Sequence, residues 1–217
     1  MEIPDAVLGP RDVVIVEGPD AISYVHSQVS QDVAAMAVGE SRWTFALEPT
    51  GKVIVLARVR RTGDARLELD TDAGYGEALL ARIDRFKIRV KADTSLIPAA
   101  AAGPQRDEAE RVALGWPAMG AEIVPGESLV AGTGLASIAV SFTKGCYPGQ
   151  ELVERMDSRA AESPRALRRV TVAPGAKPGD PVVDDAGEAV GELTSVAGTQ
   201  ALAWVRRGHQ IGAPIEL

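Results

Sequence analysis

The chain has 217 residues, 46% of them hydrophobic, so it can bury a core and is not expected to be disordered. Its formal net charge of −7 argues against nonspecific nucleic-acid binding, which depends on basic surface. Only 4% of the residues are aromatic, and the many small and turn-forming residues favour a strand-rich or α+β protein over a helical bundle.

The N-terminal part alternates between strand and helix patterns. Residues 13–16 form an apolar run, and the following turn carries Asp20, which can cap a helix whose apolar residues recur at helical spacing up to Val29. An amphipathic helix is predicted over 75–86, with Phe86 on its apolar face. Further strands are predicted over 43–47, 53–59 and 66–70, with a turn at 48–52. This order is typical of a sheet with helices packed on one face.

The second half of the chain has a different pattern. Residues 98–107, rich in alanine, have the composition of a linker, and 116–140 are expected to be mostly loop with short helical turns. From Leu167 onward the chain is expected to form a small closed barrel of short strands, over 168–172, 174–180, 181–183, 184–187, 191–196 and 201–205.

The terminus and the rarest residue types limit the kinds of site and location. The chain starts with an acidic segment, and no apolar run approaches about 18 residues. We therefore predict a cytoplasmic protein without a signal peptide or membrane span. With one cysteine, Cys146, and two histidines, His26 and His209, neither an intramolecular disulfide nor a metal site within one chain is expected.

The segment from Lys144 to Glu151, Lys-Gly-Cys-Tyr-Pro-Gly-Gln-Glu, is the hardest to explain by folding alone. Its two glycines allow a tight turn around Cys146, and Lys144 could favour the thiolate if both side chains are partly exposed. A helix beginning near Pro148 or Gln150 would stabilise the thiolate further. A buried structural cysteine is an equally good interpretation of the spacing.

Three other patterns have simpler explanations. His26, Ser27 and Ser30 suggest a hydrolase triad, but adjacent helical residues do not face each other, so caps or surface polar groups are favoured. Residues 49–52 resemble half of a phosphate-binding loop but are better interpreted as a hairpin turn. A basic cluster could bind a polyglutamyl or phosphate-bearing ligand, although a solvated face is the commoner explanation; it comprises Arg82, Arg85, Lys87, Arg89 and Lys91.

Taken together, the chain resembles the YgfZ branch of the aminomethyltransferase-like folate-binding family, whose eukaryotic members are mitochondrial iron–sulfur assembly factors. The matching segments occur in family order along nearly the whole chain: 18–21, 26–28 with Gln31 and Asp32, 49–52, 82–89, 141–151 and 190–195.

The resemblance implies an aminomethyltransferase-like α+β core of antiparallel sheets with packed helices, followed by a small C-terminal β-barrel. The implied divisions are a folate-binding-type domain at 1–97, a linker and motif-bearing segment at 98–163, and the barrel at 164–217.

It also implies a role in assembling or maintaining iron–sulfur proteins, including those that modify tRNA, with Lys144 and Cys146 as functional residues. Its partners would be iron–sulfur client or assembly proteins, with neither direct nucleic-acid nor membrane binding. Tetrahydrofolate or a derivative would be the cofactor, contacted by Gln28, Asp32, Lys52, Arg89, Tyr147, Gln150, Glu151 and Arg155.

The departures from the family argue against one activity. Glycine-cleavage T-proteins carry an acidic pair just after the glycine turn, whereas this chain has Val-Ile-Val-Leu at 53–56, which cannot transfer protons. The family glutamate that contacts the pterin corresponds to Ala113. We therefore expect an accessory protein rather than an enzyme, with tetrahydrofolate-dependent aminomethyl transfer as the alternative. A binding module without thiol chemistry is a third interpretation.

Overall fold

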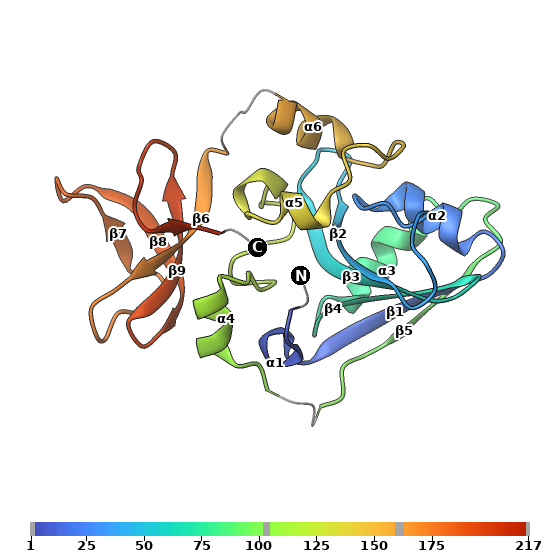
Figure 1. Ribbon diagram of the computed structural model, residues 1–217, viewed down its shortest axis with the longest axis horizontal. Helices are drawn as coiled ribbons and strands as arrows, with labels where there is room; N and C mark the ends of the chain where they lie inside the picture. Colours follow the sequence, from blue (N-terminus) through green and yellow to red (C-terminus); the bar gives the residue numbers. More distant parts are fainter. Residues whose placement is uncertain (1–2, 102–104, 159–162, 216–217) are drawn as a thin grey trace.

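The computed structural model describes residues 3–101, 105–158 and 163–215. It contains two antiparallel five-stranded sheets with helices packed around and between them (Figure 1). The helices are α1 (Asp5–Leu8), α2 (Ala21–Gln28), α3 (Gly76–Asp84), α4 (Glu108–Leu114), α5 (Ala136–Ala139) and α6 (Gln150–Ser158), with a 3-10 turn, η1 (Val130–Gly132).

The N-terminal sheet has the strand order β2-β3-β4-β1-β5, formed by β1 (Arg11–Glu17), β2 (Ser41–Leu47), β3 (Val53–Gly63), β4 (Arg66–Asp72) and β5 (Asp93–Ile97). Alternate residues of β1 and β4, such as Val14 and Leu69, are buried on the face covered by α2 and α3. The opposite face carries Trp43 and Phe45, which pack against the segment between the two sheets, including Trp116. The period-two pattern of the strands therefore separates two cores.

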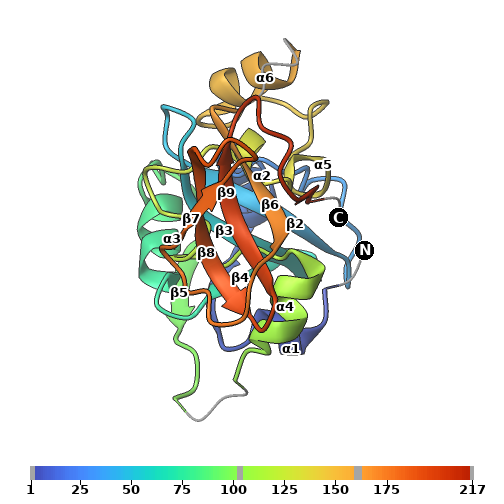
Figure 2. The same ribbon diagram turned by 90° about the vertical axis from the view of Figure 1, so that its left-hand side faces the viewer.

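The C-terminal sheet has the order β10-β6-β9-β8-β7, formed by β6 (Arg165–Thr171), β7 (Pro181–Val183), β8 (Ala189–Ala197), β9 (Gln200–Arg206) and β10 (Ala213–Pro214). Figure 2 shows this sheet face-on in front of the rest of the molecule. One face packs against α4 through Val112, Leu167 and Trp204. No closed barrel is found in the described residues, because β7 and β10 lie at opposite edges and do not pair.

A buried polar cluster joins the C-terminal sheet to the central segment. Arg111 of α4 donates to the Glu122 carboxylate at 2.8 Å, and Glu122 also accepts from Thr194 and Ser195 of β8 at 2.7 and 2.6 Å. The indole of Trp204 donates to the Glu122 carbonyl at 3.1 Å. The sheet is thereby held by paired charge as well as by apolar contact.

Several local predictions need correction. The Asp20 side chain does not cap α2; it accepts from the Lys91 amide at 2.8 Å instead, because residues 18–20 pack against the loop before β5. The helix predicted over 75–86 ends at Asp84, so Phe86 lies beyond it and is 41% exposed.

In the C-terminal part, residues 174–180 and 184–187 form turns rather than strands, since the Asp180 and Asp184 carboxylates accept from neighbouring amides. Residues 102–104 of the predicted linker lie outside the described residues. Among the residues described, no helix combines the length and apolar character that crossing a bilayer requires. The two boundaries between the three predicted divisions stay a prediction.

Candidate functional site

The predicted motif forms a loop, residues 141–149, between α5 and α6. We call it the motif loop. It begins where the Ser141 amide donates to the Ser30 carbonyl at 2.9 Å, and it ends where α6 starts at Gln150. In Figure 1 the loop and α6 lie above the C-terminal end of β2, next to α2. A helix therefore begins close to the cysteine, as the sequence suggested.

Lys144 anchors the loop to the C-terminal end of α2. Its Nζ donates to the carbonyl of His26, to that of Val29 at 2.7 Å and to that of Gln31 at 3.2 Å. A cation at this end of a helix is favoured by the helix dipole and by the free carbonyls of the last turn. Burial lowers the pKa of Lys144 to about 8, while the Asp32 carboxylate opposes this shift.

The three donors of the Lys144 ammonium are therefore committed to three carbonyls. Nζ also lies 5.1 Å from the centre of the Tyr147 ring, in cation–π contact. No donor remains for the Cys146 thiol, so the simple picture in which Lys144 stabilises the thiolate by a direct hydrogen bond does not match this geometry. Its role is to hold the loop.

Tyr147 anchors the loop from the other side. It is 7% exposed and packs in the core that contains Leu47 and Val140. Burial raises the pKa of Tyr147 to about 12, and the nearby Glu154 carboxylate adds to the shift. Its hydroxyl has no hydrogen-bond partner among the described residues.

The end of the loop is fixed by close backbone packing. Gly149 has a φ of 86°, and a Cβ there would lie 2.5 Å from the Glu48 carbonyl oxygen, so only glycine fits. The Gln150 side chain accepts from the Tyr147 amide at 3.2 Å and donates to Glu154. These contacts tie the loop to the hairpin at 48–52.

Cys146 lies between these anchors and is exposed. A Cβ added at the preceding Gly145 would have no neighbour within 4 Å among the described residues, so the loop here faces open space. Cysteine is among the most commonly buried residue types, and an exposed one on an anchored loop is therefore unusual. The interpretation of Cys146 as a buried packing residue is excluded.

The other predicted ligand contacts fall in several places. Gln28 is buried and accepts from Arg82 at 3.1 Å, and Asp32 is half-buried and accepts from the Ala35 amide at 3.1 Å. Lys52 is exposed on the hairpin, and Arg89 is exposed beyond the end of α3. Glu151 and Arg155 are exposed and pair with each other along α6. The structure brings Gln28, Asp32, Tyr147 and Gln150 close to the Lys144 anchor, but not Arg89.

The hydrolase triad is not assembled. His26 Nδ1 accepts from the Ala34 amide at 3.2 Å, while the Ser27 and Ser30 hydroxyls donate to the carbonyls of Tyr24 and Ala139. Ser27 bonds the backbone of its own helix, as expected for a local side-chain contact, whereas Ser30 joins this segment to the end of α5.

Two features differ from the sequence prediction or were missed by it. Arg82, which the sequence grouped with a basic cluster, is buried and does not belong to a solvated face. Arg82 is 3% exposed; it donates to the Leu47 carbonyl at 2.6 Å and to Gln28, and its Nη2 has no partner among the described residues. On the other face of the N-terminal sheet, Asp70 pairs with Arg11 at 2.8 Å and with Arg58 at 3.0 Å, and both guanidinium groups lie over Trp43. The alternation of Asp70 and Asp72 with Leu69 and Thr71 in β4 could have indicated inward-facing carboxylates.

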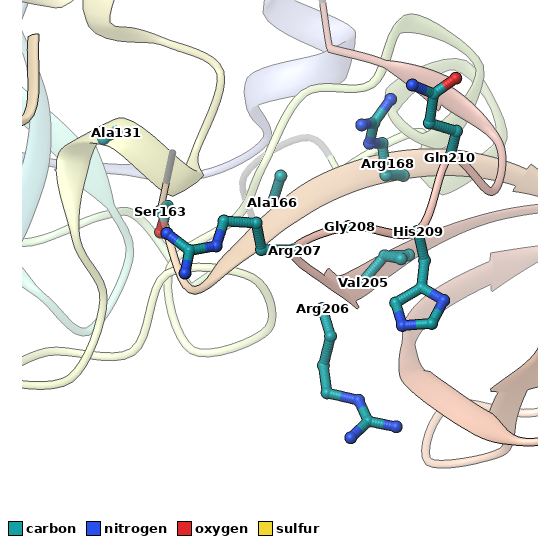
Figure 3. A pocket seen from close by; sticks show the side chains of 10 residues that line it. All are labelled: Ala131, Ser163, Ala166, Arg168, Val205, Arg206, Arg207, Gly208, His209 and Gln210. Atoms are coloured by element: carbon teal, nitrogen blue, oxygen red, sulfur yellow. The ribbon is translucent and has the colours of Figure 1, made fainter. Parts of the chain in front are cut away.

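The cavities found lie elsewhere. One of about 240 Å³ opens beside the C-terminal sheet (Figure 3), and a smaller one of about 70 Å³ lies between Ser128 and Trp204. In Figure 3, Arg168 and Gln210 lie together while Arg207 points towards Ser163. None of the predicted folate contacts lines either cavity. In the described part of the chain, no three His, Cys, Asp or Glu side chains are grouped to hold a metal ion.

Comparison with known proteins supports the architecture. Residues 165–217 match the family model described as the CAF17 C-terminal beta-barrel domain. A solved structure, the glycine cleavage system aminomethyltransferase T from Bartonella henselae, superposes with a TM-score of 0.80 over 90% of this chain and 76% of that one, at 15% identity. The search of curated proteins gave no match. The chain therefore has an aminomethyltransferase-like fold that ends in a CAF17-type C-terminal domain, which confirms the predicted fold class.

Proposed function

We propose that this protein is a cytoplasmic accessory factor of the YgfZ type, which helps to assemble or maintain iron–sulfur proteins, including enzymes that modify tRNA. Three observations support this proposal. The fold is that of an aminomethyltransferase, and the C-terminal part matches a CAF17-type domain. The Lys144–Glu151 motif begins in the motif loop, which Lys144 fixes to the end of α2.

The observation that carries the proposal is the exposure of Cys146. Lys144 fixes one side of the loop to three carbonyls, and Tyr147 fixes the other side in the core. The thiol between them is held outward by a loop that has little freedom to withdraw it. A partner molecule can therefore reach the sulfur without unfolding any part of the chain.

The chemistry proposed for Cys146 is transient ligation of iron. The thiol releases its proton to solvent, and the thiolate sulfur binds an iron atom of the cargo. One cysteine supplies one ligand, so the remaining ligands come from a client protein, a second chain or glutathione. The iron or cluster is cargo in this scheme and passes on when the client binds it more tightly.

Aminomethyl transfer is less well supported. The printed name of the superposed structure describes such an enzyme, but in this chain the residues after the glycine turn are apolar. Val53, Val55 and Leu56 are buried and Ile54 is half-buried, so no carboxylate stands at these positions to handle an amine.

The described residues do not fit the folate set predicted from the sequence. The proposed contacts are divided between the Lys144 anchor, the surface of α6, Lys52 on the hairpin and Arg89, and none of them lines either of the two cavities described above. The Trp43–Trp116 contact, with ring centres 4.4 Å apart, and the Arg–Asp pairs fill the inner face of the N-terminal sheet. We therefore assign no step of the function to a folate.

The proposal is tested in cells that lack the native protein, by measuring iron–sulfur enzyme activity after supplying variants. Cys146→Ala should fail to restore activity, and Lys144→Ala should restore it only partly, because the loop loses its anchor. Thr143→Ala, an exposed neighbour in the same loop, is the matched control and should restore activity fully. Full restoration by both Cys146→Ala and Lys144→Ala would overturn the thiol function.

A further inference from the structure

The connection between α3 and β5, residues 85–91, is an exposed loop that alternates basic and apolar side chains. We call it the basic loop. Ile88 is 78% exposed and Phe86 is 41% exposed, and Arg85, Arg89 and Lys91 are exposed beside them. In Figure 1 the loop lies at the end of the N-terminal sheet farthest from the C-terminal sheet.

The cations of this loop fall into two groups. Lys87 points inward and pairs with Asp84 at 3.0 Å. In contrast, no carboxylate of the described residues lies within 4 Å of Arg85, Arg89 or Lys91. Two guanidinium groups lie near the centre of the Phe86 ring, that of Arg82 at 5.3 Å and that of Arg85 at 5.6 Å. Arg85, Arg89 and Lys91 therefore leave positive charge beside the exposed apolar side chains of this loop, in a chain whose net charge is −7.

The loop is held in one shape. The Lys91 amide donates to the Asp20 carboxylate at 2.8 Å, and the Lys91 carbonyl accepts from the Asp20 amide at 3.2 Å. The Ile88 amide donates to the Phe86 carbonyl at 2.9 Å. Arg89 has a φ of 58°, the only positive value found for a residue other than glycine in the described chain. Such a conformation is unfavourable for arginine by roughly 1 kcal/mol and persists where the surrounding structure imposes it.

We propose that the basic loop is a docking surface for a partner protein that carries an apolar pocket ringed by acidic side chains. Ile88 would enter the pocket, with Phe86 at its margin, and Arg85, Arg89 and Lys91 would meet the acidic ring. Arginine and exposed apolar side chains are the groups that dominate protein interfaces, and a preformed loop loses little conformational entropy when it binds.

The charge distribution favours a protein over a nucleic acid or a membrane. Outside this loop the chain is more acidic than its net charge of −7 indicates. An RNA or an anionic bilayer extends beyond the loop and would bring that acidic surface within the screening length of about 8 Å. A discrete acidic patch on a protein meets only the loop.

The docking surface and the motif loop border the same helix. Arg82 under Phe86 donates to Gln28 at 3.1 Å, and Lys144 donates to the next residue, Val29, at 2.7 Å. The residues at the C-terminal end of α2 therefore connect Arg82, beside the basic loop, with the Lys144 anchor of the motif loop. This inference adds a partner surface to the proposed function, but docking itself does not require the thiol.

The test is photocrosslinking in cells. A photoreactive phenylalanine derivative replaces Ile88, and in a control protein it replaces Ile97, which is 53% exposed on β5. We expect a discrete protein adduct from position 88 and none from 97. Adding Arg85→Glu and Arg89→Glu should reduce that adduct at least fivefold, whereas Arg206→Glu and Arg207→Glu, in the C-terminal sheet, should leave it unchanged.

The identity of the adduct and two binding assays complete the test. Reversing acidic residues on the captured partner should restore the adduct to the Arg85→Glu and Arg89→Glu protein. An adduct that is unaffected by charge reversal, or equal at positions 88 and 97, would overturn the proposal. Loop-dependent binding to oligouridylate or to phosphatidylglycerol vesicles, stronger than to the captured protein, would do the same.

The Cys146→Ala variant separates this inference from the proposed function. It should keep the adduct at position 88 even though it fails to restore iron–sulfur enzyme activity. A lost adduct with Arg85→Glu and Arg89→Glu together with full activity of Cys146→Ala would leave the docking surface standing and remove the thiol function.

Discussion

Arg111 and Lys144 are both cations withdrawn from solvent, but they hold different kinds of structure. Arg111 meets two carboxylates, those of Glu122 and Glu108, within a cluster whose other members also find partners inside the protein. Lys144 meets three backbone carbonyls, and the loop that it fixes carries an exposed thiol. The first arrangement pairs buried groups with one another and joins the C-terminal sheet to the central segment, whereas the second exposes a thiol. The Arg111 cluster therefore stabilises the fold, whereas Lys144 positions the motif loop.

The largest effect is expected at the Arg111 cluster. Glu122→Gln removes a buried charge that accepts four hydrogen bonds, from Arg111, Ala118, Thr194 and Ser195. Breaking such a pair should lower the free energy of unfolding by about 3 kcal/mol or more, because Arg111 loses its buried partner. Urea denaturation measures the change.

Glu108→Gln is the matched control, since Glu108 binds the same arginine but is 53% exposed. An exposed pair contributes at most about 1 kcal/mol, so this variant should unfold close to the wild type. If both variants lower the free energy of unfolding equally, the contact between the C-terminal sheet and the central segment does not depend on the buried Glu122 carboxylate.

The sequence predicts the strands and helices better than it predicts the contacts that position the Lys144 site. An apolar run located β1, the turn at 48–52 separated β2 from β3, and period-two alternation located β4. The spacing of Ala21, Tyr24 and Val25 located α2, because all these patterns depend on local geometry. Phe86 fitted the helical period but lies outside α3, because period alone does not mark the end of a helix.

The sequence could identify the residues of the site, but it could not predict their contacts. The motif drew attention to Lys144 and Cys146, yet the carbonyls that bind Lys144 belong to residues 26–31, which are distant in sequence. Whether Lys144 faces the thiol or the helix end is decided only when the two segments meet. For the same reason the unpaired Nη2 of Arg82 could not be anticipated.

The next effect concerns the protonation of Lys144. Because burial lowers its pKa to about 8 from 10.5, the folded state binds fewer protons than the unfolded state between these values. Stability from this group therefore rises with pH between about 8 and 10.5 and is constant below. The difference in unfolding free energy between the wild type and Lys144→Met should move in favour of the wild type over this window, by at most about 3 kcal/mol.

Denaturation series at pH 7, 8.5 and 10 measure this slope, and Lys52→Met, which makes the same change at an exposed position, is the matched control. If the difference in unfolding free energy stays flat or falls with pH, the hydrogen bonds to the three carbonyls stabilise the charged ammonium more than burial destabilises it. Lys144 would then resemble Arg111, as a cation kept charged by its partners.

The smallest effect is expected at Tyr147, whose hydroxyl is buried without a partner among the described residues. Tyr147→Phe removes an unsatisfied polar atom and keeps the ring over Lys144, so stability should stay the same or rise by up to about 1 kcal/mol. Tyr24→Phe is the matched control, because the Tyr24 hydroxyl donates to the Ile83 carbonyl; its free energy of unfolding should fall by about 1 kcal/mol.

Thermal unfolding of the two variants side by side gives the sign of each change in stability. If Tyr147→Phe loses as much as Tyr24→Phe, the hydroxyl has a partner in solution. If it also fails to restore iron–sulfur enzyme activity while remaining stable, that hydroxyl acts on the cargo rather than on the fold.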